Sequence, residues 1–184
     1  MAARRRVLVV GGTSGIGRAI AERFAADGAE VLATGASAAE VQAAVTSGPP
    51  GSLQFETLDV RDAAAVDALL GRQPSLDVLV NCAGIIRRGD ELDPAVFAQV
   101  IDINLNGTMR TCSAARPLLA RTRGCIVNTA SMLTFFGGGL VPGYAASKGG
   151  VGQLTKSLAI AYADDGIRVN AVAPGWIATP LTDA

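Results

Sequence analysis

The sequence predicts an α/β fold in three layers, a doubly wound parallel β-sheet with helices on both of its faces. Short runs rich in β-branched residues alternate with longer alanine-rich segments that carry apolar residues at helical spacing. The expected strands are apolar throughout, as strands are when helices cover both faces of a parallel sheet. No repeat or linker interrupts this pattern, so residues 1–184 are expected to form one domain.

Local signals justify the elements of the first half. Apolar Ile16, Ile20 and Phe24 repeat at helical spacing after the first strand. Ser37 and Glu40 form a capping box that begins the second helix, and Asp62 caps the third. The expected order is strand 6–10, helix 15–27, strand 30–34, a helix from residue 37, strand 53–58, helix 63–70 and strand 76–81.

The second half opens with an N-cap, Asp93, followed by Pro94 at the first helical position, which predicts a long helical region. Pro117 should kink or end that region, because proline lacks the N–H that an interior helical position uses. Gly166 is expected to stop the last helix. The remaining order is helix 93–121, strand 125–130, helix 144–163 and strand 168–173.

Composition and charge exclude several classes of protein. Apolar residues make up 49% of the chain and 16 basic side chains balance 16 acidic ones, which argues against disorder and against general nucleic-acid binding. The apolar runs are too short to span a membrane. A short strand and two glycines follow the arginines at positions 4–6, so we interpret these arginines as a solvated tail and not as a signal peptide.

The cysteine and histidine content restricts the chemistry. The three cysteines have no CxxC spacing and the chain has no histidine, so no metal site is expected. The odd number of cysteines fits a reducing, cytoplasmic location, and Cys82 and Cys125 are interpreted as buried apolar side chains. Without histidine there is neither a Ser-His-Asp triad nor a Cys-His pair. Acid–base chemistry must therefore use Tyr, Lys, Asp, Glu or Cys.

A glycine-rich turn joins the first strand to the first helix in the stretch VLVVGGTSGIGRAI. Gly11, Gly15 and Gly17 allow a tight turn that brings backbone N–H groups close to a ligand, and the positive end of the following helix points to the same place. Glycines alone would also suit a plain turn. Their position between the first strand and the first helix favours a bound pyrophosphate, and hence a dinucleotide.

Tyr144 and Lys148 in the stretch YAASK lie one helical turn apart on the same helix face. A free tyrosine has a pKa of about 10, too high for a base at neutral pH. Because an ammonium group favours the phenolate, we predict that Lys148 lowers the pKa of Tyr144. The pair alone is more typical of a solvated helix face. The glycine turn upstream favours the interpretation that Tyr144 and Lys148 take part in acid–base chemistry.

The spacing Gly-x-x-x-Gly-x-Gly resembles that of the short-chain dehydrogenase/reductase family, and further stretches along nearly the whole chain are similar to its motifs. NCAG resembles the family's Asn-Asn-Ala-Gly, with Cys82 as a departure, DINLNGT resembles the segment of its active-site asparagine, and PGWIATP resembles the stretch along the nicotinamide. The resemblance implies a Rossmann-like, NAD(P)-dependent enzyme that interconverts a CH–OH group and a ketone by hydride transfer.

The resemblance also implies a role for each matching residue. Tyr144 exchanges a proton with the substrate oxygen, and Lys148 lowers its pKa and binds the nicotinamide ribose. Ser131 donates a hydrogen bond to the substrate oxygen, and Asn104 holds a water that links Lys148 to solvent. The implied catalytic set is Asn104, Ser131, Tyr144 and Lys148. The implied cofactor-binding set is Gly11, Thr13, Ser14, Gly15, Ile16, Gly17, Asp59, Val60, Asn81, Ala83, Gly84, Tyr144, Lys148, Pro174, Gly175, Ile177 and Thr179.

The choice between NAD and NADP stays open in the sequence. An acid after the second strand would bind the ribose 2′-hydroxyl of NAD, but that region reads Thr-Gly-Ala-Ser, residues 34–37. An arginine typical of NADP-binding relatives is missing there too, and Ser14 stands where some of them have a basic residue. Arg18 lies one turn inside the helix, and Ser37 could bond a phosphate or simply cap its helix.

The substrate is a small molecule, and its class is inferred from two stretches. AGIIRRGDELD and SMLTFFGGGLVPGYAASK resemble the family branch that contains sugar-acid dehydrogenases. Arg87 and Arg88 could face an anionic substrate, although two solvated loop arginines are the slightly better explanation. The alternative assignment is a 3-oxoacyl thioester reductase, which shares most of these motifs.

Family members usually continue beyond PGWIATP through a substrate-covering lid and a last strand, and these are expected to be missing here. The chain could then be a non-catalytic dinucleotide-binding module, although a pure binder would need no proton donor such as Tyr144. Relatives usually pair through two long helices, here residues 93–121 and 144–163, so the resemblance implies a homodimer or homotetramer.

Overall fold

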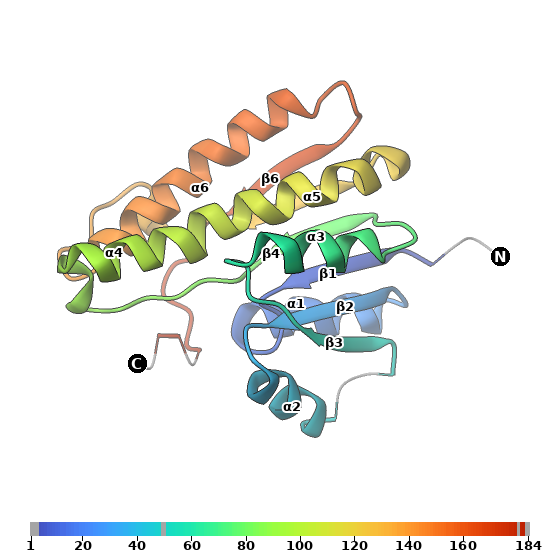
Figure 1. Cartoon of the computed structure of the whole chain (residues 1–184), viewed down its shortest axis with the longest axis horizontal. Coiled ribbons are helices and arrows are strands. Elements are labelled where there is room, and N and C mark those ends of the chain that lie inside the picture. The colour runs from blue at the N-terminus through green and yellow to red at the C-terminus, as the bar shows by residue number, and fades with distance from the viewer. Residues whose placement is uncertain (1–3, 49–50, 180, 183–184) are drawn as a thin grey trace.

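The computed structural model describes residues 4–48, 51–179 and 181–182. They form a six-stranded sheet in the order β3-β2-β1-β4-β5-β6, and every neighbouring pair of strands is parallel (Figure 1). The strands are β1 (Arg6–Val10), β2 (Glu30–Gly35), β3 (Leu53–Thr57), β4 (Val78–Asn81), β5 (Cys125–Thr129) and β6 (Arg168–Val172). The doubly wound parallel sheet predicted from the sequence is confirmed.

The strand order reverses between β1 and β4. The chain passes from β1 outward to β2 and β3, and then returns to place β4 on the other side of β1. Val10 at the end of β1 is in register with Asn81 at the end of β4. The loops that follow these two strands therefore leave the sheet side by side, at the kind of crevice where open α/β sheets bind ligands.

Helices cover both faces of the sheet. They are α1 (Gly15–Ala26), α2 (Ala38–Thr46), α3 (Ala63–Gly71), α4 (Pro94–Ile101), α5 (Gly107–Thr122) and α6 (Pro142–Ala161). On one face, Leu79 of the sheet belongs to a buried cluster with Leu119 of α5 and with residues of α3 and α6. On the other face, Val9 packs with Ala21 of α1. Figure 1 shows α3 and α5 in front of the sheet and α1 behind it.

The expected helix 93–121 is divided into two helices. Asp93 caps α4 and Pro94 takes its first position, as predicted. A π-helical segment, Asp102–Asn106, then separates α4 from α5. Pro117 does not end α5, which continues to Thr122. Pro117 is exposed, and so is Ser113, whose carbonyl loses its helical partner, so water can satisfy that carbonyl on the solvent side.

Helix α6 begins at Pro142, two residues earlier than expected, because proline suits the first helical position. Strand β6 forms the outer edge of the sheet beside β5, and most of its residues are exposed. Within the described part of the chain, no helix has both the length and the apolar character needed to cross a membrane.

Candidate active site

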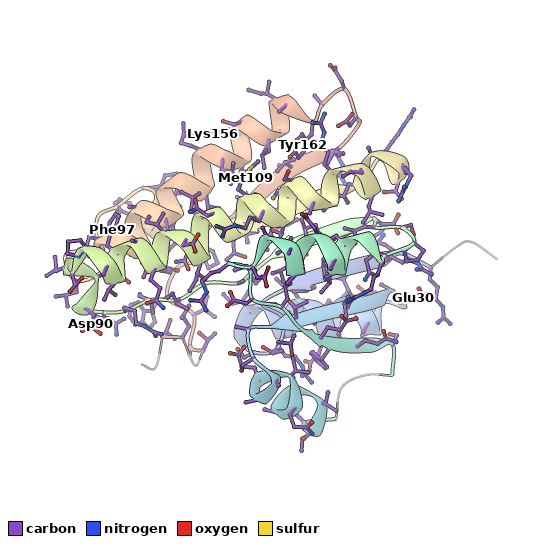
Figure 2. All side chains as sticks on the ribbon, in the orientation of Figure 1. Glu30, Asp90, Phe97, Met109, Lys156 and Tyr162 are labelled. Carbon is purple, nitrogen blue, oxygen red and sulfur yellow. The ribbon has the colours of Figure 1, made fainter. Side chains whose placement is uncertain are left out.

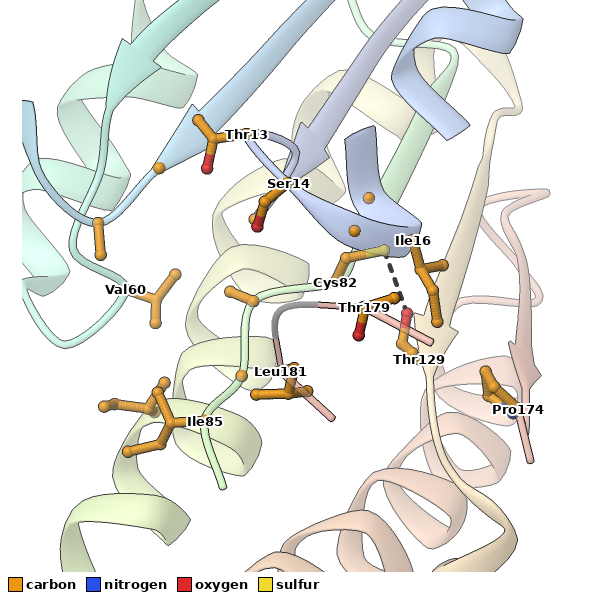
Figure 3. A pocket seen from close by; sticks show the side chains of 18 of the residues that line it. Thr13, Ser14, Ile16, Val60, Cys82, Ile85, Thr129, Pro174, Thr179 and Leu181 are labelled. Carbon is orange, nitrogen blue, oxygen red and sulfur yellow. Dashed lines mark hydrogen bonds between the residues drawn. The ribbon is translucent and has the colours of Figure 1, made fainter. Parts of the chain in front are cut away.

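A cavity of about 480 Å³ opens at the carboxyl ends of the strands, around the loops after β1 and β4 (Figure 3). The structure brings together there all but two of the residues that the resemblance singled out. The members that line it are Gly11, Thr13, Ser14, Gly15, Ile16, Gly17, Asp59, Val60, Ala83, Gly84, Ser131, Tyr144, Lys148, Pro174, Gly175, Ile177 and Thr179. Asn81 and Asn104 do not line it and lie buried beside it.

The glycine turn fits tightly against the loop after β4. Gly11 has a φ of +77°, and a Cβ at this position would lie 2.4 Å from the backbone nitrogen of Ala83. A Cβ at Gly17 would lie 2.1 Å from the carbonyl oxygen of Gly11. Only glycine fits at these two positions, and the turn therefore keeps bare backbone and the N-terminus of α1 at the cavity, an arrangement that fits the pyrophosphate of a dinucleotide.

The segment after β6 closes over the glycine turn. A Cβ at Gly15 would meet the side chain of Thr179 at 3.4 Å, so the two loops approach each other across the cavity. Thr179 and Leu181 on this segment line the same cavity as Cys82 of the loop after β4 (Figure 3). The Cys82 sulfur lies 3.2 Å from the Thr129 hydroxyl, within hydrogen-bonding distance, and burial raises the pKa of the thiol.

Asn104 lies in the π-helical segment and is fully buried. Its side-chain oxygen accepts a hydrogen bond from the backbone N–H of Ile85 at 2.8 Å, and its amide nitrogen donates to the carbonyl of Ile85 at 2.9 Å and to the Ser147 hydroxyl at 3.1 Å. Asn104 therefore holds the loop after β4 against α6. The π-helical geometry, which is frequent at functional sites, turns this side chain toward that loop.

Asn81 is the other predicted site residue that lies outside the cavity. Its side-chain oxygen accepts from the Thr111 hydroxyl at 2.8 Å, and its amide nitrogen donates to Asn128 at 2.9 Å. Asn128 in turn donates to Thr155 of α6 at 3.0 Å. In this buried network Asn81 ties the end of β4 to β5 and α5, so its contribution to the cavity is to fix the strand end from which the NCAG loop departs.

Lys148 is buried and points its ammonium group at the cavity. The nitrogen donates to the carbonyl of Thr129 at 2.6 Å and lies 5.5 Å from the centre of the Tyr144 ring. Burial lowers the pKa of Lys148 to about 8. A lysine with such a pKa is charged through most of the neutral range but gives up its proton more readily than an exposed one.

Tyr144 differs from the prediction in the direction of its pKa. Burial raises the pKa of Tyr144, a hydrogen bond with Ser131 opposes this effect, and the charge of Glu91 adds to it. The prediction that Lys148 lowers the pKa was thus wrong for this structure. The reason is that desolvation of the phenol is the largest effect on this pKa and outweighs the hydrogen bond from Ser131.

Ser131 is buried beside Tyr144 at the end of β5. Its hydroxyl oxygen accepts from the N–H of Leu133 at 3.2 Å, because Ser131 caps the short helix Met132–Thr134. The hydroxyl hydrogen of Ser131 can then be donated to the Tyr144 oxygen, or to a ligand oxygen that takes its place. Capping thus fixes the position of this side chain before any ligand binds.

Sequence reasoning missed Glu91, a carboxylate that is 1% exposed. One of its oxygens accepts from the backbone N–H of Arg87 at 2.7 Å, and the other accepts from the backbone N–H of Tyr144 at 2.7 Å. Glu91 therefore links the loop after β4 to the first turn of α6. No local pattern distinguishes it from the acidic loop residues around it, because its partner on α6 is remote in sequence.

A crevice at the strand-order reversal, with a half-buried tyrosine and a buried serine and lysine among its lining residues, defines a nicotinamide-dependent α/β oxidoreductase. The family model described as short chain dehydrogenase matches residues 5–184, and the chain belongs to this family. Its cofactor is accordingly NAD or NADP, and its reaction is oxidoreduction at a CH–OH group of a small molecule, as predicted.

Relatives that are named for different substrates are identical in sequence to this chain to a similar percentage. It is 40% identical over 186 residues to 2-dehydro-3-deoxy-D-gluconate 5-dehydrogenase of Bacillus subtilis, covering 97% of this chain and 73% of that protein. It is 38% identical to the 3-oxoacyl-acyl-carrier-protein reductase FabG of Thermotoga maritima, covering 96% and 75%. The crystal structure of F189W actinorhodin polyketide ketoreductase with NADPH is similar to this chain with a TM-score of 0.89 and 32% sequence identity. The match covers 99% of this chain and 75% of that one.

Proposed function

We propose that the protein interconverts a secondary alcohol and a ketone on a sugar acid or a related hydroxy compound, with Asn104, Ser131, Tyr144 and Lys148 as its catalytic set. The observation that carries this proposal is that Ser131, Tyr144 and Lys148 line the same cavity as the glycine turn. A substrate oxygen beside these side chains would lie within reach of a bound nicotinamide.

The bound nicotinamide supplies or accepts the hydride. In ketone reduction, Tyr144 donates its phenolic proton to the oxygen that gains negative charge as the hydride arrives at the carbon. In alcohol oxidation, the Tyr144 phenolate takes that proton back. Ser131 donates a hydrogen bond to the same oxygen and stabilises its charge. Lys148 binds the nicotinamide ribose and recharges Tyr144 with a proton, a role that its lowered pKa suits.

The experiment that tests this role is Tyr144→Phe. The substitution removes the proton donor and keeps the ring, so turnover should fall by about 10²–10⁴-fold while dinucleotide binding remains. Turnover is followed by the absorbance of the reduced nicotinamide, and binding is followed by calorimetry. Unchanged turnover in Tyr144→Phe would remove the mechanism. Dinucleotide binding by the unsubstituted protein without turnover on any ketone would instead support a non-catalytic binding module.

The 40% sequence identity to 2-dehydro-3-deoxy-D-gluconate 5-dehydrogenase supports the proposal that the substrate is a sugar acid. Arg87 and Arg88 are exposed in the segment after NCAG, and the guanidinium of Arg88 lies 5.5 Å from the centre of the Trp176 ring. Trp176 stands between Gly175 and Ile177, which line the cavity, so a cation lies close to the cavity segment after β6. An anionic substrate fits this charge.

The second candidate, reduction of a 3-oxoacyl thioester, is supported by the identity to the carrier-protein reductase. A panel of 2-dehydro-3-deoxy sugar acids against acetoacetyl thioesters separates the two. Turnover of the sugar acids alone supports the first assignment. Turnover of the thioesters alone replaces it with the second.

We also propose that copies of the chain associate through α4, α5 and α6 into a dimer or tetramer. Figure 2 shows Phe97, Met109 and Lys156 on this helical layer. Met109 and Ile160 are exposed apolar side chains on α5 and α6, as expected for an interface. Light scattering after size-exclusion chromatography tests the assembly, and a monomeric mass would contradict it. A cytoplasmic location is proposed because the three cysteines are free thiols.

A further inference from the structure

One end of the cavity carries an acid that the sequence pattern did not place there. Glu40 lines the cavity together with Thr13, Gly35 and Ala36, although it belongs to the first turn of α2 and not to the end of β2. In dinucleotide-binding folds of this kind, the end of β2 is where an acidic side chain binds the adenosine ribose. The structure therefore supplies from the helix the acid that residues 34–37 lack.

Contacts with the end of β2 hold the Glu40 carboxylate in place. The backbone N–H of Ala36 donates to its Oε2 at 3.0 Å, and the Ser37 hydroxyl lies 3.4 Å from its Oε1. A Cβ at Gly35 would lie 3.1 Å from Oε2 and 2.7 Å from the Thr13 methyl group. The carboxylate thus folds back over Gly35, the last residue of β2, beside Thr13 of the glycine turn, which Figure 3 labels. Each carboxylate oxygen keeps a lone pair for a hydroxyl donor.

Each of the cations at or near the cavity has a hydrogen-bonding partner. Among the described residues that line it, the cationic ones are Lys148 and Arg61. Lys148 lies with Tyr144 at the other end of the cavity. Arg61 forks onto Asp59, with three nitrogen–oxygen distances of 2.6 to 3.0 Å, and holds the pKa of Asp59 below its usual value. Arg18 donates to the carbonyl of Ala44 at 3.0 Å. Because Asp59 pairs with Arg61, Glu40 leaves the net charge of these three lining side chains negative.

We propose that Glu40 makes the protein prefer NAD(H) to NADP(H), by accepting a hydrogen bond from the adenosine ribose hydroxyls and repelling a 2′-phosphate. This inference rests on the proposed function, because it concerns the same dinucleotide site. A phosphate monoester carries close to two negative charges at neutral pH. Its repulsion by one carboxylate at the distance of a hydrogen bond corresponds to a discrimination of at least about tenfold in a water-exposed site.

The test is Glu40→Gln, with direct binding of NADH and NADPH as the readout. Glutamine keeps the shape of the side chain and suits the third position of a capping box, so α2 should remain folded. Calorimetry gives both dissociation constants without any substrate. Quenching of Trp176, the one tryptophan of the chain, provides a second readout beside the cavity. The matched control is Glu56→Gln, which removes an exposed carboxylate of β3 that pairs with Arg72 and does not line the cavity.

We expect the unsubstituted protein to bind NADH more tightly than NADPH. We expect Glu40→Gln to lower the ratio of the NADPH dissociation constant to the NADH dissociation constant about tenfold, mainly by strengthening NADPH binding. Glu56→Gln should leave the ratio unchanged. Tighter binding of NADPH by the unsubstituted protein, or a ratio that Glu40→Gln does not move, would overturn this inference and leave the proposed function intact. Binding of neither dinucleotide would overturn both.

Discussion

The buried carboxylate of Glu91 provides the sharpest test of how the fold positions the tyrosine. Its two oxygens accept backbone hydrogen bonds of 2.7 Å from Arg87 and from Tyr144, and its side chain is 1% exposed. Glu91→Gln keeps the size of the side chain but replaces one acceptor oxygen by an NH₂ group. One of the two backbone N–H groups then faces a donor inside the protein, where no water replaces the lost acceptor.

Leaving one buried donor without an acceptor costs about 1–3 kcal/mol of unfolding free energy. For a chain of this length, that loss corresponds to a decrease in Tm of about 2–12 °C. Urea unfolding and thermal melts measure the two quantities. The control is Glu56→Gln, whose exposed pair with Arg72 should contribute less than about 1 kcal/mol. Equal stability of Glu91→Gln and Glu56→Gln would refute the structural reasoning.

The same substitution has a second, independent signature at Tyr144. The charge of Glu91 raises the pKa of Tyr144, so its removal should lower that pKa relative to the unsubstituted protein. In alcohol oxidation, which needs the phenolate, the rising limb of the pH profile of kcat should move to lower pH. A shift to higher pH would show that the loss of charge is not the dominant effect at the phenol.

Three further outcomes follow from particular residues. Burial lowers the pKa of Lys148 from 10.5 to about 8, so the cost of burying its charge is fully present below pH 8 and is relieved as the pH rises toward 10.5. Between these pH values, the unfolding free energy of the unsubstituted protein should rise by about 3 kcal/mol relative to that of Lys148→Met, as measured by urea unfolding. Gly17→Ala should destabilise the protein by at least about 1–3 kcal/mol in thermal melts, whereas Gly149→Ala, which meets no atom within 4 Å in α6, should be neutral or stabilising. Cys112, whose pKa burial raises to about 12, should resist iodoacetamide at pH 8 until the protein is denatured, and mass spectrometry of the native protein would show any early labelling.

Local patterns in the sequence predicted much of the fold and many of the candidate site residues. The six strands, the helices α1, α2, α3 and α6, and the start of α4 at Asp93 and Pro94 were recognisable from apolar periodicity and from caps. The glycine turn was recognisable because only glycine can occupy positions like Gly11 and Gly17, where a Cβ would meet backbone atoms. These signals are readable because their physical cause lies within a few residues of each position.

Pro117 and the division of the helical region 93–121 show the limit of such signals. A proline inside a helix costs less where the carbonyl that it leaves without a partner can bond water, and here both Ser113 and Pro117 are exposed. The π-helical segment around Asn104 likewise depends on the contacts of Asn104 with Ile85 and Ser147, which are distant in sequence. Neither outcome could be derived from the segment alone.

By itself, the sequence determined the alternation of strands and helices, the glycine turn and the family, because those features are local patterns of residue type and spacing. Only the tertiary structure decided that Glu40 reaches the cavity from α2, that Glu91 binds the backbone of Tyr144, and that the pKa of Tyr144 rises. The physical reason is that burial and electrostatic contact depend on which remote segments meet. The residues adjacent in sequence to a carboxylate or a phenol do not indicate which remote residues will surround it in the folded protein.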